Sequence, residues 1–80
     1  MKIEMRDGRV FQGTPLQIVK AMQDIAFGVG DFTVPKYVAW VVDNAQRFEG
    51  VALAVEGETD EALATSLVDG MLGAGLAKRG

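Results

Sequence analysis

Apolar and polar residues alternate with two different periods along the chain, and together with turn and cap residues they predict six elements. The first two are the strands of a β-hairpin, because residues 2–12 alternate with period two around an Asp-Gly pair at positions 7 and 8, the pair favoured in two-residue hairpin turns. In the register that this turn sets, Met5 faces Val10 on the apolar side. Phe11 then pairs with Glu4 on the outer side, and a shift of one residue would bring Phe11 inside.

Three later stretches follow the 3.6-residue period of amphipathic helices. Threonine is a favoured N-cap residue and glycine a favoured terminator, so the expected helices lie between Thr14 and Gly28, between Thr33 and Gly50, and between Thr59 and Gly75. The stripes that we expect to be buried are Ile18, Val19, Met22, Ile25 and Ala26; Val38, Val41, Ala45 and Phe48; and Leu63, Ala64, Leu67, Met71 and Ala74. On the first helix, Gln17, Lys20, Gln23 and Asp24 are expected to face water.

A short apolar run at residues 51–55, VALAV, predicts a third strand because it is partly β-branched and bounded by glycine-containing turns. Residues 76–79 would add a short fourth strand at an edge. The expected order is therefore β-β-α-α-β-α. It predicts a single α+β domain over residues 1–80, in which three helices pack on a three-stranded, or four-stranded, sheet.

The composition restricts how such a domain is stabilised and what it can catalyse. The 80 residues contain neither cysteine nor histidine, so the chain lacks disulfides, the thiolate and imidazole ligands of zinc, and the usual general base near neutral pH. We expect no metal and no cofactor. Because a domain this short has a small core, oligomerisation is the support that remains open to it.

The distribution of charge disfavours some partners. The net charge is −3; residues 1–40 carry +1 and residues 41–80 carry −4, and no basic run occurs. Phosphate backbones and anionic membrane surfaces are therefore not expected as partners. No apolar run approaches the ~20 residues of a membrane span, and the start lacks the apolar stretch of a secretory leader. We expect a cytoplasmic protein.

Three features resemble functional motifs without matching their spacing. The carboxylates of EGETDE at residues 56–61 do not fit an EF-hand loop. The glycines of GMLGAG at residues 70–75 lie at the end of a helix, where the dipole disfavours phosphate. Ser66, the only serine, belongs to a strip of small residues, Ala62, Ser66, Gly70 and Ala74, which favours close packing within the chain over contact with another copy. No catalytic constellation is present, and we do not expect an enzyme.

Trp40 is the main candidate for a functional residue, since the helical wheel places this large apolar side chain among Lys36, Asp43 and Arg47. Tryptophan beside arginine is typical of interface hot spots, although Trp40 at the periphery of the core is the other interpretation. The candidate interface residues are Trp40, Lys36, Arg47, Phe11, Val68 and Leu72. We expect an adaptor-like or regulatory protein-interaction domain that forms a homodimer. The alternative is a small-molecule or peptide binder with a pocket between the hairpin and the second helix, lined by Phe11, Tyr37 and Trp40.

The opening MKIEMRDGRVFQGTPLQIVKAM resembles the start of ubiquitin-like ligand-binding modules of the TGS type, in which a hairpin with Asp-Gly leads into a TP-x-x-I helix. The resemblance covers about the first quarter of the chain and implies a ligand-binding module. Beyond it, this sequence continues with a second long helix where that fold returns to strands, and no family is assigned from it.

Overall fold

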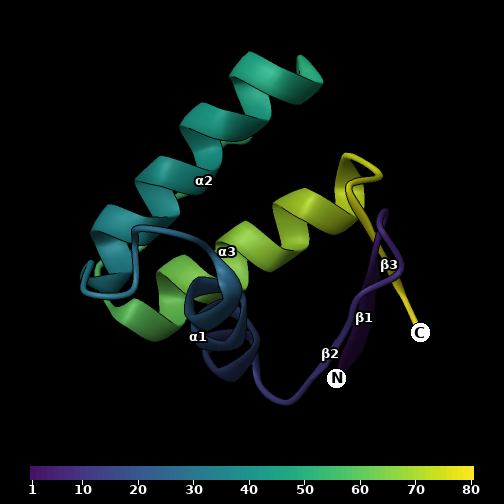
Figure 1. Cartoon of the computed structure of the whole chain (residues 1–80), viewed down its shortest axis with the longest axis horizontal. Helices are drawn as coiled ribbons and strands as arrows, with labels where there is room; N and C mark the ends of the chain where they lie inside the picture. Colours follow the sequence, from purple (N-terminus) through teal and green to yellow (C-terminus); the bar gives the residue numbers. More distant parts are fainter.

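Three helices pack beside a three-stranded antiparallel sheet in the computed structural model, which describes residues 1–80. The elements are β1 (Lys2–Met5), β2 (Val10–Gln12), α1 (Pro15–Ile25), α2 (Val34–Glu49), α3 (Asp60–Gly73) and β3 (Ala77–Arg79). The strand order is β2-β1-β3, so both ends of the chain lie on the sheet (Figure 1). The predicted α+β class, with three strands and three helices, is confirmed; the position of the third strand differs from the prediction.

The hairpin forms at the predicted place but in a register shifted by one residue. Ile3, not Glu4, lies opposite Phe11. The turn has three residues: the amide of Gly8 donates to the carbonyl of Met5 (3.0 Å), and the amide of Met5 donates to the carbonyl of Arg9 (2.8 Å). Gly8 has φ +90°, the left-handed conformation that closes three-residue hairpins. The shift turns Phe11 inward, so its predicted outward orientation was wrong, and it is half-buried against the core.

The three predicted threonine caps are confirmed. Thr14, Thr33 and Thr59 each accept a hydrogen bond from the amide three residues later, which satisfies one of the free donors at each helix start. Gly50 ends α2 with φ +65°. The first helix stops at Ile25, which is 52% exposed instead of buried as expected.

The loop between α1 and α2 is organised by Gln23, which was expected to face water. Its side chain is buried instead, and the amide nitrogen donates to the carbonyls of Val29 and Phe32, each at 2.8 Å. Burial is tolerated because a buried polar group with good partners costs little. Val29, within the loop, and Val34, the first residue of α2, are both buried in the core.

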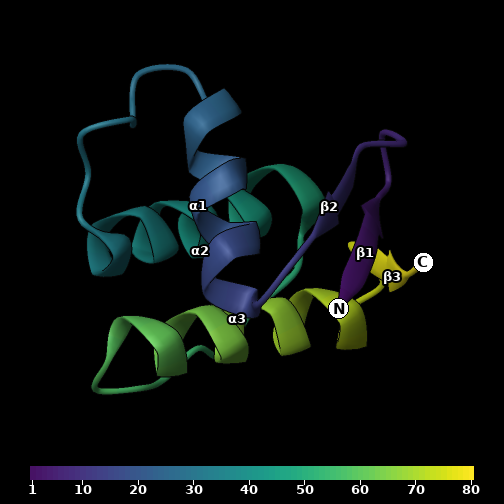
Figure 2. The same ribbon diagram turned by 90° about the horizontal axis from the view of Figure 1, so that it is seen from below.

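The helix α3 is the centre of the packing. It runs beneath α1 and α2 and ends beside the sheet (Figure 2), and it contacts α1, α2 and β3. Ala64, Leu67, Val68 and Met71 are buried along it. The core also takes Ile3 from β1 and Ile18 and Val19 from α1, all of them without exposed surface.

The segment 51–57 is extended, but it forms no strand, so the third strand predicted at 51–55 was wrong. Its side chains alternate between more buried and more exposed positions, as in an extended segment that is covered on one face. It lies along α3 instead of the sheet: Leu53 approaches Gly70, and the amide of Glu56 donates to Ser66 Oγ at 3.2 Å. The middle of the strip of small residues, at Ser66 and Gly70, therefore packs against this chain, as predicted, whereas Ala62 is exposed.

The third strand is β3, at the position expected for an optional edge strand. Gly75 ends α3 in the left-handed conformation (φ +77°), and Leu76 folds back so that its amide donates to the carbonyl of Met71 at 2.9 Å, as in a Schellman motif. This reversal sends β3 antiparallel along β1. None of the three helices combines the length and the apolar character needed to cross a bilayer.

Candidate functional site: a groove between the hairpin turn and α2

Helix α2 has one buried apolar face and a second apolar face that nothing covers. Val34, Val38 and Ala45 are buried. Phe48, which was expected to be buried with them, is 76% exposed, and Trp40 is 38% exposed. The prediction for Phe48 was wrong because the last turns of α2 extend beyond the helices beneath it (Figure 1). Two large aromatic side chains are consequently left at the surface on a single helix.

Trp40 is neither fully exposed nor part of the core. Its ring stacks on that of Tyr37, with 5.8 Å between the ring centroids and 23° between the planes. Tyr37 itself is only 2% exposed. Offset stacking at this separation is a favourable aromatic arrangement, so Tyr37 holds the indole in place while much of its surface stays accessible.

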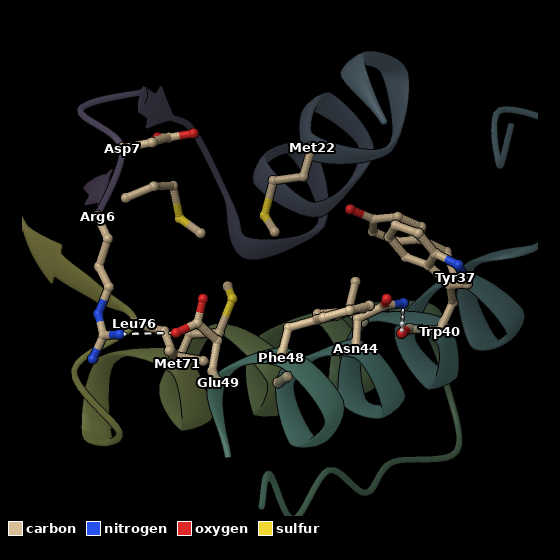
Figure 3. Close-up of a pocket in the computed structure, with 13 residues that line it drawn as sticks. Arg6, Asp7, Met22, Tyr37, Trp40, Asn44, Phe48, Glu49, Met71 and Leu76 are labelled. Atoms are coloured by element: carbon tan, nitrogen blue, oxygen red, sulfur yellow. Dashed lines mark hydrogen bonds and ion pairs between the residues drawn. The ribbon is translucent and has the colours of Figure 1, made fainter. Parts of the chain in front are cut away.

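A groove of about 380 Å³ runs between α2 and the turn of the β1–β2 hairpin (Figure 3). This volume falls at the lower end of the ~300–1,000 Å³ typical of ligand pockets. Nine of its thirteen lining residues are hydrophobic. The lining residues are Met5, Arg6, Asp7, Met22, Tyr37, Trp40, Val41, Asn44, Ala45, Phe48, Glu49, Met71 and Leu76.

Three of the four methionines of the chain meet in this groove. Met5 comes from β1, Met22 from α1 and Met71 from α3. Methionine is unbranched and polarizable, and it recurs at surfaces that adapt to different apolar side chains. The groove therefore has an apolar lining that can adjust its shape.

The two ends of the groove differ in polarity. At one end Arg6 Nη1 lies 3.1 Å from Glu49 Oε2, and Arg6 Nε donates to the carbonyl of Gly75 at 3.0 Å. These contacts tie the hairpin turn to the end of α2 and to the turn after α3. Figure 3 shows this ion pair on one side and the Tyr37–Trp40 stack on the other. A molecule bound in the groove would therefore meet charged side chains at one end and aromatic rings at the other.

The hydroxyl of Tyr37 is the most informative polar group in the groove. It points into the cavity on the side of Met22 (Figure 3), and no hydrogen bond in the chain uses it, although Tyr37 is almost completely buried. No side-chain oxygen that is sealed from solvent lacks a partner, so this hydroxyl opens into the groove. The hydroxyl is protonated and able to donate at neutral pH, and burial raises the pKa of Tyr37 from 10.0 to about 12, so it stays protonated over a wider range of pH.

The structure brings some of the predicted interface residues to this site and places others elsewhere. Trp40 forms its rim. Lys36 lies on the neighbouring face of α2, with its Nζ 4.3 Å from the centre of the Phe32 ring, and Arg47 pairs with Asp43 at 3.3 Å.

Phe11 lines a second cavity of about 190 Å³, which shares Met5, Asp7, Met22 and Tyr37 with the groove. The pocket predicted between the hairpin and the second helix therefore exists as two adjoining cavities, with Tyr37 in both.

Val68 was wrong as an interface candidate, and Leu72 lies outside the groove. Val68 has no exposed surface, and Leu72 is half-buried against the core. Both lie off the stripe of α3 that the wheel assigned to the core. They are covered because α3 is packed by α1, α2 and β3 together instead of by one layer.

Sequence reasoning missed most of the groove. Arg6, Glu49 and the three methionines lie on five different elements or turns, and no spacing along the chain relates them. Asn44 was missed for another reason: it looked like an ordinary polar residue of an exposed face, yet it lines the groove, with its Nδ2 donating to the carbonyl of Trp40 at 2.7 Å.

The arrangement has the apolar lining and the few polar groups of a binding groove. Across the molecule no three carboxylates come together in a way that would hold a metal ion. Comparisons with protein-family models, with curated proteins and with solved structures find no match for this chain.

Proposed function

We propose that this protein is a protein-interaction module, without catalytic activity of its own, which takes an apolar side chain of a partner polypeptide into the groove between the hairpin turn and α2. The observation that carries the proposal is the apolar groove, into which the hydroxyl of the mostly buried Tyr37 opens without a hydrogen-bond partner in the chain. A ligand carbonyl in the groove would give this hydroxyl an acceptor in place of water.

The polarity of the groove supports a polypeptide as the occupant. A peptide offers both an apolar side chain for the methionine-lined floor and a backbone carbonyl for Tyr37. The rim is exposed along Arg6, Trp40, Phe48 and Glu49, as in a groove that a longer segment crosses, whereas a small-molecule site encloses ~70–90% of its ligand. Tryptophan and tyrosine beside a pocket are typical hot-spot residues of such contacts. The cytoplasmic location expected from the sequence belongs to this proposal.

The proposal is tested by a titration monitored by NMR, with N-acetyl-phenylalaninamide as the probe because it combines one apolar side chain with two carbonyls. We expect saturable shifts of the Trp40 indole N–H and of the methyl groups of Met5, Met22 and Met71. N-acetyl-glycinamide, which lacks the side chain, should leave these signals unchanged. Shifts that scatter over the surface, or that do not saturate, would contradict the proposal.

Two variants sharpen this test. Trp40→Ala should weaken the probe about 10-fold, because it removes the aromatic rim. Phe27→Ala is the matched control, since Phe27 is fully exposed in the loop between α1 and α2 and does not line the groove. Equal affinities of both variants for the probe would show that binding does not depend on the groove.

A further inference from the structure

We infer that the partner is a second copy of this chain, and that two α2 helices pack antiparallel about a twofold axis at Asn44. This inference rests on the proposed function and names the polypeptide that reaches the groove. It follows from the pattern of the uncovered face of α2, from the exposed apolar area, and from the side chains that flank it.

The uncovered face of α2 is complementary to itself. Trp40 and Phe48 each lie four residues from Asn44, or ~6 Å along the helix axis on either side of it. When the helix is turned around at Asn44, Trp40 of one copy meets Phe48 of the other, and the same contact occurs twice. A twofold interface requires this property, because each residue must meet its counterpart in both directions. The exposed Phe48 thereby reaches the end of the groove formed by Trp40 and Tyr37.

The exposed apolar area on this face would form the centre of a dimer interface. Phe48 and Trp40 are 76% and 38% exposed. At the ~150–250 Å² that aromatic side chains bury, these two residues offer about 170–285 Å² on each copy. A standard interface covers ~800 Å² on each partner, so the two aromatic residues would supply about a fifth to a third of it, as the apolar centre within a more polar rim.

The flanking polar groups also fit this orientation. Antiparallel packing brings Arg47 beside the partner's Trp40, where a guanidinium is attracted to the face of the indole. Arg47 is available for this contact because its pair with Asp43 is exposed and therefore weak. The two Asn44 side chains meet at the axis, and each has an amide oxygen that its bond to Trp40 leaves free. A polar residue in such a position fixes the register of paired helices.

Tyr37 gains an acceptor in the same arrangement. The last turn of the partner's α2 lies at the end of the groove where the Tyr37 hydroxyl opens. Helix geometry leaves the final carbonyls of α2 without intrahelical donors. The donor that has no partner within one chain can therefore reach acceptors that have none in the other.

A single-cysteine variant tests the orientation directly, because the chain contains no cysteine. Asn44→Cys places one thiol on the proposed axis, and mild oxidation should give a disulfide-linked dimer in high yield, since a bridge needs a Cα–Cα separation of about 4.4–6.8 Å. Gln46→Cys is the matched control: it is exposed on the opposite side of α2, beside Leu53 and Val55, and should remain mostly monomeric. Equal cross-linking of the two variants would overturn the inference.

Sedimentation of the unmodified chain tests the association itself. We expect a dimer at high concentration, and Phe48→Ser should raise its dissociation constant about 100-fold or more, because the lost contact occurs twice. Phe27→Ser, which removes a fully exposed aromatic outside this face, should leave the constant within about twofold. A chain that sediments as a monomer at every soluble concentration, or a dimer indifferent to Phe48→Ser, would overturn the inference. If that monomer still binds N-acetyl-phenylalaninamide in the groove, the proposed function stands with a different protein as partner.

Discussion

Helices α2 and α3 begin with the same kind of cap, but the rest of the fold covers them to different extents. Each starts at a threonine cap and carries large apolar residues on more than one side. Helix α3 is packed by α1, α2 and β3, and the segment 51–57 lies along its strip of small residues. Helix α2 is covered on the side of α3, whereas its other apolar side forms the wall of a groove.

This difference shows how far a helical wheel predicts which side chains are buried. The wheel predicted that Val68 would be free and that Phe48 would be buried, and both predictions were wrong in opposite directions. A wheel finds apolar residues, but burial depends on how many neighbours the fold places around the helix. The central helix buries residues off its main stripe, and the peripheral helix leaves part of its stripe exposed.

The largest expected contrast in stability is between one residue of each helix. Leu67→Ala should lower the free energy of unfolding by about 3 kcal/mol, because Leu67 has no exposed surface and its removal leaves a cavity. Phe48→Ala should change the free energy of unfolding of the monomer by no more than about 0.5 kcal/mol, as is usual at exposed positions. Denaturant titration at a concentration that keeps the chain monomeric measures both. A similar loss for the two variants would contradict the comparison.

The groove side of α2 should give a pH dependence that α3 lacks. The folded pKa of Tyr37, about 12, lies above its ordinary value of 10.0 because of burial. Folding favours the protonated form of Tyr37. Its stabilising contribution to the free energy of unfolding is therefore fully present below pH 10 and is lost as the pH rises towards 12. The loss should amount to about 2 kcal/mol.

Tyr37→Phe serves as the control for this titration, because it lacks the ionisable group but keeps the ring. The difference between the two unfolding curves isolates the contribution of Tyr37 from that of every other group in the chain. Since Tyr37 is the only tyrosine, tyrosinate absorbance of the folded protein reports its pKa alone. A midpoint at pH 10 would mean that Tyr37 is not buried.

The segment that covers α3 should depend on the glycine at which it turns. Gly57 has φ +154°, and a Cβ there would lie 2.8 Å from both the Cβ of Ala62 and the backbone nitrogen of Leu63. Gly57→Ala should therefore destabilise the fold by about 2 kcal/mol, through backbone strain and a clash that no side-chain rotation relieves. Thermal unfolding measures this change, and an unaltered midpoint would show that the segment is loosely attached.

The smallest expected effect has the opposite sign. Gly70 lies within α3, and a Cβ there would meet only Leu53 Cδ2, at the ordinary contact distance of 3.6 Å. Gly70→Ala should stabilise the fold by up to about 1 kcal/mol, because alanine has the higher helix propensity. A destabilised variant would mean that the covering segment approaches α3 more closely than these distances indicate.

Local signals in the sequence predicted most of the fold. Thr14, Thr33 and Thr59 marked the starts of the helices, and Gly50 marked the end of α2, because caps act over a few residues. The segment 51–55 shows where such signals stop: its apolar, partly β-branched composition predicted a strand, and the backbone is extended, but the element beside which it lies is set by the whole fold. The one-residue shift of the hairpin likewise depended on the length of its turn, which an Asp-Gly pair does not determine.

The site was less predictable than the fold. Trp40 and Tyr37 were found because a tryptophan on a polar face and a nearby tyrosine are visible on one helix. The methionine floor and the Arg6–Glu49 pair arise only when the hairpin, α1, α2 and α3 come together. Sequence patterns report neighbours within one element, whereas this groove is made of contacts between elements.

The most direct test of the claim that α2 carries an uncovered binding face uses the fluorescence of Trp40, the only tryptophan. Emission and acrylamide quenching are followed over a dilution series, with circular dichroism reporting the fold. The account predicts blue-shifted, protected emission at high concentration, and red-shifted, readily quenched emission on dilution while the fold persists. Emission that is protected and constant where sedimentation shows only monomer would place Trp40 in the core and contradict the account.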